Sequence, residues 1–249
     1  SYSRDRATDE LPQSSSGRTI MTTEPKFIPE KAVEVKLGNG CNLKTRLIDC
    51  VGYIVPSSLG YIEDNEPRMV MTPWYEDPIP FNMAAEIGTQ KVINEHSTIG
   101  LVITTDGSIS DIDRDEYEDA EERVINELKE INKPFVVLLN CVNPQSSNSL
   151  ILADKLSEKY NTPVIPVNCV DLTGDKIKEI IKSVLFEFPI REIGIDMPGW
   201  INSLDVSHWL RSDICRVISE NASNLEKIRD CSKLEDDLCS CENIIAVSH

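Results

Sequence analysis

The chain has 249 residues, of which 40% are apolar and 27% charged, and this is the composition of an ordinary globular protein. Its length allows one large domain, or one domain and part of a second. With 42 acidic and 25 basic residues the net charge is −17, so we expect no nucleic-acid partner. No uncharged apolar run reaches the roughly 18 residues of a membrane-spanning helix, so we expect no transmembrane segment.

The eight cysteines form no recognisable disulfide framework. Their spacing is irregular, and four of them lie in or beside apolar, strand-like runs, which is typical of reduced, buried thiols in a cytosolic protein. Cys231, Cys239, Cys241 and His249 could be imagined as zinc ligands, but their spacing matches no standard zinc motif. We therefore expect free thiols and no structural metal.

The first 80 residues predict one hairpin between two loops. Residues 1–30 are polar and interrupted by prolines and a glycine, which favours a loop. Two β-type runs, 31–37 and 43–50, flank Gly38-Asn39-Gly40, and an Asn-Gly pair between such runs is the strongest short-range hairpin signal. Residues 52–80 contain five prolines and are predicted as a long, irregular segment, which is usually functional or disordered.

Strands and helices alternate from residue 81 onward. Helices are predicted over 81–95, 114–131, 149–160 and 174–186, and strands over 98–105, 134–140 and 163–169. The strands are continuous apolar runs, such as PFVVLLN, which is typical of strands covered by helices on both faces. The alternation predicts an α/β fold with a mostly parallel sheet.

The alternation ends near residue 189. Residues 190–197 are predicted as one more strand, and the chain from about residue 207 to residue 249 as one polar, charged helix with a weak apolar face. We therefore divide the chain into a domain over 1–189 and a segment over 190–249, which we interpret as a linker and the start of a second, helical domain.

The segment 46–52 carries the sharpest functional signal. An apolar strand ends in Asp49, and Gly52 follows three residues later. In open α/β sheets ligands bind at the carboxyl ends of strands. In P-loop NTPases such an aspartate belongs to the Mg²⁺ shell, and the glycine N–H can approach the γ-phosphate. The tetrapeptide by itself is equally consistent with a plain turn that ends a strand.

Two further loops fit the same chemistry. The threonine-rich loop 17–25 precedes the hairpin, and in switch GTPases a threonine of this loop reaches Mg²⁺ and is ordered by the γ-phosphate. The strand 134–140 ends in Asn140-Cys141-Val142-Asn143, where guanine-specific proteins carry Asn-Lys-x-Asp. An asparagine at 143 accepts hydrogen bonds from the guanine edge less well than a carboxylate. The alternatives are a solvated loop and a strand-end cap.

Several long segments carry a family resemblance. They are residues 9–13, 17–27, 47–53 (LIDCVGY), 67–81, 84–109, 120–130 and 208–211 (HWLR). Together they resemble the stage IV sporulation protein A family, over about residues 5–211, and the resemblance fades after Arg211. It implies a P-loop protein of the translation-factor-like GTPase class that hydrolyses ATP, with ATP and Mg²⁺ as cofactors.

The resemblance also implies a place and partners. The family polymerises into the basement layer of the spore coat, in the cytoplasm on the mother-cell side of the outer forespore membrane, as a peripheral protein. The implied partners are further copies of itself, other spore coat proteins and a small amphipathic peptide at the membrane surface.

Residue roles follow from the matching motifs. Asp49 matches the Walker B position and would bind Mg²⁺, while Thr22 and Thr23 match the sensor threonines that respond to the γ-phosphate, with Thr22 as a second metal ligand. The resemblance thus implies catalytic roles for Thr22, Thr23 and Asp49. Gly52, Asn140 and Asn143 are the candidate nucleotide-binding residues, and the altered motif at 140–143 fits a loss of guanine specificity.

One departure concerns the phosphate-binding loop. The sequence contains no Gly-x-x-x-x-Gly-Lys-Ser/Thr, and Gly174-Asp175-Lys176 is not one. The strand before that loop, central in this class of sheet, is absent as well. The expected fold is therefore an incomplete P-loop GTPase-like three-layer sandwich, with a mostly parallel sheet, one antiparallel hairpin and no central first strand. We expect the chain to begin after these parts and to be inactive by itself.

Three functions compete on this sequence. The first is part of a sporulation ATPase that self-assembles, the second is a GTPase-class regulator in which Asn140 contacts guanine, and the third is a non-catalytic interaction module that cannot cradle phosphates. Competition between ATP and GTP separates the first from the second.

Overall fold

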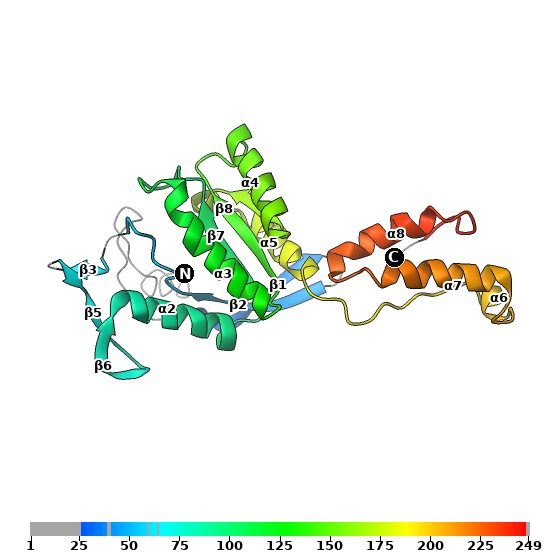
Figure 1. Cartoon of the computed structure of the whole chain (residues 1–249), viewed down its shortest axis with the longest axis horizontal. Coiled ribbons are helices and arrows are strands. Elements are labelled where there is room, and N and C mark those ends of the chain that lie inside the picture. Colours follow the sequence, from blue (N-terminus) through cyan, green and yellow to red (C-terminus); the bar gives the residue numbers. More distant parts are fainter. Residues whose placement is uncertain (1–25, 39–40, 59, 64, 248–249) are drawn as a thin grey trace. The chain divides into compact units, whose positions relative to one another are not determined.

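The computed structural model describes residues 26–38, 41–58, 60–63 and 65–247 (Figure 1). The chain divides into two compact units between Val184 and Leu185. Of the predicted loop over residues 1–30, residues 1–25, with Thr22 and Thr23, lie outside the described residues. Residues 26–30 are part of a strand, so the loop prediction is wrong there.

The predicted hairpin is confirmed. Strand β1 (Lys26–Gly38) pairs antiparallel with β2 (Cys41–Asp49), and the register joins Val35 to Leu43 and Lys26 to Asp49. A register shift interrupts the pairing between residues 28 and 33. The hairpin therefore places Asp49 at the carboxyl end of β2, as the strand pattern predicted.

The prediction of irregular structure over 52–80 is partly wrong. Four short strands form two antiparallel pairs there: β3 (Ile62–Glu63) with β4 (Glu66–Pro67), and β5 (Met69–Thr72) with β6 (Tyr75–Pro80). The described residues thus hold three antiparallel pairs, where the sequence predicted one. Strands β3 and β4 have only two residues each, and prolines interrupt the segment, so the sequence shows too little periodicity to predict these strands.

The alternating part folds as predicted, with small differences at the element ends. The helices are α2 (Phe81–Lys91) with η1 (Val92–His96), η2 (Arg114–Tyr117) with α3 (Glu118–Glu130), α4 (Ser147–Tyr160), η3 (Cys169–Asp171) and α5 (Gly174–Phe186). The strands β7 (Gly100–Thr105), β8 (Phe135–Asn140) and β9 (Val164–Val167) form a parallel sheet in the order β7-β8-β9.

Strand β8 is the centre of the first unit, because its side chains are buried on both faces. On one face Val137 and Leu139 pack with Ile125 and Leu128 of α3 and Ala153 of α4. On the other face Val136 and Leu138 form a second apolar cluster with Ile180 and Val184 of α5. The sheet thus lies between two helical layers, and this arrangement explains the unbroken apolar run of β8.

Strand β7 is covered less completely. Leu101 and Ile103 share the α5 face of the sheet, since they pair with Val136 and Leu138, yet they are 38% and 62% exposed. Among the described residues β7 pairs only with β8, so its other edge carries no strand. In this part of the chain the hairpin β1–β2 forms a sheet of its own.

The second unit corrects two predictions. Residues 190–197 form no strand, and the only pairing near them is an isolated antiparallel bridge between Pro189 and Lys227. The predicted single helix from 207 to 249 is instead α7 (Trp209–Ala222), η4 (Ile228–Asp230) and α8 (Cys231–Cys239), preceded by the short α6 (Gly199–Asn202).

The break after α7 has a local cause and a tertiary cause. Ser223 and Asn224 bond back through their side chains to the carbonyls of Ser219 and Glu220, and such residues favour helix ends. The next residues pair with the chain that follows α5: Ile190 N–H donates to Glu226 O at 2.9 Å, and Ile228 N–H donates to Phe188 O at 3.0 Å. This pairing replaces the continuous helix.

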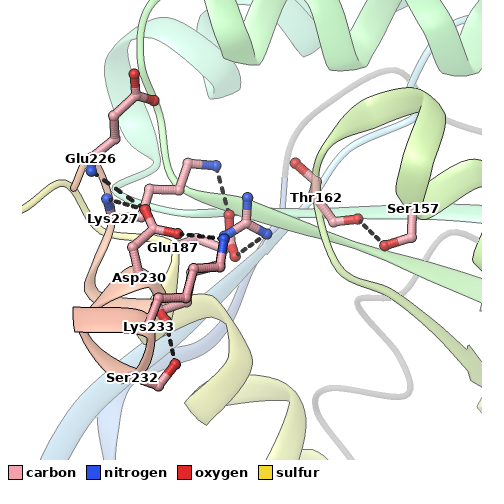
Figure 2. Close-up of polar contacts among 9 residues, drawn as sticks. Ser157, Thr162, Glu187, Glu226, Lys227, Asp230, Ser232 and Lys233 are labelled. Atoms are coloured by element: carbon pink, nitrogen blue, oxygen red, sulfur yellow. Dashed lines mark hydrogen bonds and ion pairs between the residues drawn. The ribbon is translucent and has the colours of Figure 1, made fainter. Parts of the chain in front are cut away.

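A buried carboxylate secures that pairing. Glu187 is 2% exposed and lies between Lys227, at 2.7 Å, and Arg229, at 3.1 Å (Figure 2). Asp230 accepts the backbone N–H of Lys227 at 2.9 Å in the same cluster. Because removal of one partner from a buried ion pair leaves an uncompensated charge, this cluster fixes α8 to the start of the second unit.

Candidate functional site

The candidate functional residues lie in two regions, after the carboxyl end of β2 and after the carboxyl end of β8. Asp49 is the last residue of β2 and is partly buried. Burial raises the pKa of its carboxyl group, and the backbone N–H of Cys50 lowers it to a smaller extent. A carboxylate whose charge is disfavoured by burial gains from a bound cation, so Asp49 fits the role of a Mg²⁺-associated residue.

Gly52 lies where the chain leaves Asp49, and its φ of +79° explains why glycine stands there. Its backbone N–H donates to the hydroxyl of Thr89 on α2 at 3.1 Å. The Thr89 hydroxyl also bonds the thiol of Cys50. Burial raises the pKa of that thiol, while its hydrogen bonds with Gly52 and Thr89 act in the opposite direction.

Tyr53 fixes the other end of this loop. Its hydroxyl donates to the Glu127 carboxylate of α3, and the Arg123 guanidinium lies 3.9 Å from its ring centroid. Burial raises the pKa of the Tyr53 hydroxyl, and Glu127 raises it further. Arg123 in turn pairs with Glu86 of α2 at 3.0 Å. The segment from Asp49 to Tyr53, which we call the β2 loop, is therefore attached by side chains to both α2 and α3.

The loops after β8 and β9 are attached to each other. Asn140 accepts the backbone N–H of Cys169 at 3.0 Å through Oδ1, and Asn168 donates to the carbonyl of Val142 at 3.4 Å. The Cys141 N–H donates to Val167 O at 2.9 Å. Residues 140–143 and 168–171, which we call the paired loops, thus interlock across the sheet edge.

Asn143 borders a cavity of about 350 Å³ beside the paired loops. Its Oδ1 accepts the N–H of Gln145 at 3.2 Å, and Asp106, at the end of β7, lies on the same cavity. The Asp106 carboxylate accepts hydrogen bonds from Ser108 and Ser149; despite some burial, which acts to raise it, the pKa of this group is lowered by these bonds. Most of the residues that line this cavity are polar, with Val142 and Leu152 as the apolar ones, and the cavity lies at the strand ends.

The predicted site residues in the described part of the chain fall into two groups. Asp49 and Gly52 belong to the β2 loop, and Asn140 and Asn143 belong to the paired loops. Thr22 and Thr23 lie outside the described residues. No cluster of three His, Cys, Asp or Glu side chains suited to a metal ion occurs in the described part of the chain.

Sequence reasoning missed three contributors. Thr89 and Tyr53 had no local signal, because their importance comes from contacts with residues 37 and 74 positions away. The second loop of the pair did have one: the tripeptide Asn-Cys-Val occurs both at 140–142 and at 168–170, after neighbouring strands. That repetition could have identified Asn168 as the counterpart of Asn140.

The comparisons with known proteins agree along the whole chain. The family model described as stage IV sporulation protein A, ATPase domain, matches residues 1–189, and the model of the middle domain of the same family matches residues 190–249. Curated relatives named stage IV sporulation protein A include that of Bacillus anthracis, 49% identical over 231 residues, and that of Clostridioides difficile strain 630, 48% identical over 229 residues.

These alignments cover 93% and 92% of this chain and 47% of each relative, so the chain spans about half the length of the curated relatives it matches. No solved structure matches the chain. No helix among the described residues is long and apolar enough to cross a membrane.

Proposed function

Because the chain belongs to the stage IV sporulation protein A family, we propose that it is the nucleotide-responsive part of a sporulation ATPase whose ATP hydrolysis drives self-assembly of the spore coat basement layer on the forespore surface. The observation that carries the proposal is the β2 loop. It combines a partly buried carboxylate with raised pKa at a strand end and a glycine N–H three residues later.

The proposed roles follow from the chemistry of each group. Asp49 would hold Mg²⁺, and this ion would neutralise phosphate charge during hydrolysis. The Gly52 N–H would donate to the γ-phosphate, and Thr22 and Thr23 would sense that phosphate, with Thr22 also on the metal. Ordering of such loops by a γ-phosphate changes the surface that a subunit offers to its neighbours.

The paired loops would lie beside the base. Asn140 and Asn143 are the proposed nucleotide-binding residues, and Asn140 would act by holding the loop after β9 in place. The position of the usual lysine is taken by Cys141, which is 0% exposed. Position 143 offers an amide where a guanine-specific protein has a carboxylate, and this supports ATP over GTP.

The proposed ATP hydrolysis needs a phosphate-binding loop, and this sequence contains no such motif. We propose that the strand before it pairs with the free edge of β7, and that the helix after it covers Leu101 and Ile103. The exposure of these two side chains beside the buried α5 cluster supports this arrangement. Residues 1–189 would then be an ATPase domain completed by that segment, and residues 190–249 a linker and the start of the middle domain.

Location and partners complete the proposal. The parent protein would act in the cytoplasm, on the mother-cell side of the outer forespore membrane, as a peripheral protein. Its partners would be further copies of itself, other spore coat proteins and a small amphipathic membrane-surface peptide.

The test uses the full-length protein with the residue numbers of this chain. Asp49→Asn should reduce Mg²⁺-dependent ATP hydrolysis by about a hundredfold or more, because the metal loses its carboxylate. Asp77→Asn is the matched control, since Asp77 is an exposed residue of β6. Equal turnover of Asp49→Asn and wild type would overturn the Walker B assignment.

Two further measurements address specificity and assembly. Wild-type protein should hydrolyse ATP faster than GTP; the reverse preference would support the GTPase-class regulator. The double variant Thr22→Ala, Thr23→Ala should bind ATP and yet form no pelletable polymer. Absence of any nucleotide binding by wild type would support a non-catalytic interaction module.

A further inference from the structure

The proposed function needs the Gly52 N–H as a donor to the γ-phosphate, and in the structure this N–H is already bonded to Thr89. Gly52 N–H donates to the Thr89 hydroxyl at 3.1 Å, and it also bonds the Cys50 thiol, which is a weak acceptor. A backbone N–H is a single donor, so a phosphate oxygen and the Thr89 hydroxyl compete for it.

Thr89 is well placed to hold this donor. It is 3% exposed, on the buried side of α2 together with Ala85 and Gly88. Its hydroxyl bonds two residues of the β2 loop, Cys50 and Gly52, from one helical position. A buried hydroxyl in this place has no need of water as a partner while it binds the loop.

Replacement of the Thr89 hydroxyl by a phosphate oxygen, as the acceptor of the Gly52 N–H, leaves no group unpaired. A phosphate oxygen that accepts the Gly52 N–H forms a charge-assisted hydrogen bond, which is stronger than the bond to a neutral hydroxyl. The released threonine can keep its bond to the Cys50 thiol or donate to the carbonyl four residues earlier in its helix. The Gly52 N–H can therefore bond either acceptor, and a switch requires two such arrangements that differ in a contact.

We propose that Thr89 is a positioning residue that holds the Gly52 N–H when no triphosphate is bound and yields it to the γ-phosphate of ATP. This inference rests on the proposed function, since it assigns to the same site a competitor for the γ-phosphate contact. A diphosphate has no γ-phosphate, so its binding leaves the Gly52–Thr89 bond intact. Thr89 thereby sets the discrimination between triphosphate and diphosphate.

The test compares affinities for a non-hydrolysable ATP analogue and for ADP in the full-length protein. Thr89→Val keeps the size of the side chain and removes the acceptor. It should tighten analogue binding about two- to tenfold, the worth of one hydrogen bond, and leave ADP binding unchanged. Thr89→Ser keeps the hydroxyl, so its ratio of the ADP to the analogue dissociation constant should equal that of wild type.

Thr72→Val is the matched control. Thr72 is also buried, at 8% exposed, but its hydroxyl has no hydrogen-bond partner among the described residues. If replacement of a buried threonine had only a general structural effect, it would weaken the binding of both ligands together, in either variant. An unchanged or lower ratio of the ADP to the analogue dissociation constant in Thr89→Val overturns the proposal.

A second readout needs no nucleotide. Amide exchange at Gly52 should be faster in Thr89→Val than in wild type, and unchanged in Thr72→Val. Equal exchange in all three proteins would show that Thr89 does not hold the loop. A wild-type protein that binds neither ligand overturns the proposed function and the switch together, whereas normal binding with an unaltered ratio overturns the switch alone.

Discussion

The β2 loop and the paired loops both follow strand ends, yet they are held in different ways. The β2 loop is attached by side chains of two helices, through Thr89 on α2 and through Arg123 and Glu127 on α3. The paired loops are attached to each other by backbone groups and by the amides of Asn140 and Asn168. The first arrangement can be released by moving a few side chains, whereas the second is part of the sheet edge.

This difference indicates which loops of the first unit can move. Local opening has a low free energy where few buried apolar contacts are broken, and a high one in the central strands. Cys141 continues directly from the fully buried β8, while Cys50 leaves the partly buried end of a two-stranded hairpin. We therefore expect the β2 loop to respond to nucleotide and the paired loops to stay fixed.

The largest expected effect is in thiol reactivity. Cys50 is partly buried and Cys141 is fully buried, so Cys141 should react only after extensive opening. We expect Cys50 to be alkylated at least about a hundredfold faster than Cys141, the ratio given by a difference of about 3 kcal/mol in opening free energy. Peptide-level mass spectrometry of partly labelled native protein measures both rates.

Cys215, an exposed cysteine of α7, serves as the internal control and should react before either. Equal alkylation rates for Cys50 and Cys141 would contradict the expectation that the β2 loop opens more easily than the paired loops.

The next largest effect is expected in the paired loops. Asn140→Ala removes the acceptor of the Cys169 N–H and should lower the free energy of unfolding by about 1–3 kcal/mol, because the donor is left without its partner. Asn143→Ala is the control: its bond to Gln145 N–H is exposed to solvent, so its loss should cost less. Urea denaturation of the chain measures both. A smaller loss for Asn140→Ala than for Asn143→Ala would contradict the interlocked arrangement.

A smaller effect is expected in the β2 loop. Tyr53→Phe keeps the ring under Arg123 and removes the hydroxyl that donates to Glu127. It should lower the free energy of unfolding by about 1 kcal/mol and speed amide exchange over residues 50–54. Hydrogen exchange followed by mass spectrometry reports the loop, with the peptide over β8 as reference. Faster exchange in both peptides would mean that Tyr53 supports the whole unit.

The smallest effect is the pH dependence of Asp49. Its pKa is raised in the folded chain, so protonation favours the fold, and this contribution is lost as the pH rises through the raised pKa. Ionised Asp49 therefore destabilises the fold at neutral pH. Asp49→Asn should raise the melting temperature at pH 7 by at most about 2–4 °C, the shift that 1 kcal/mol gives in a chain of this size.

The gain should disappear as the pH falls below the ordinary Asp value of 3.8. Asp77→Asn, at an exposed position, is the control variant. A gain that persists in acid would assign the effect to something other than ionisation.

The sequence predicted the parts of the fold whose signal is local. The apolar run 135–140 and the periodic helices 118–130 and 174–186 appear in the structure near their predicted bounds. The two strands of the predicted hairpin pair as expected, but the first begins at residue 26 and not at residue 31. Asp49 and Gly52 could be selected as a candidate site because strand, carboxylate and glycine are consecutive. The prediction over 207–249 was wrong, because pairing of residues 226–228 with the chain after α5 overrides helix propensity there.

The sequence by itself determined the family, the alternation of strands and helices, and the residue types at the strand ends, since each of these depends on neighbours in the chain. Only the tertiary structure decided that Thr89 holds Gly52, that Tyr53 is attached to α3, and that Asn140 and Asn168 interlock. The physical reason is that a hydrogen bond is decided by position in space: a threonine in a helix has the same local pattern whether its hydroxyl meets a loop or a carbonyl of its own helix.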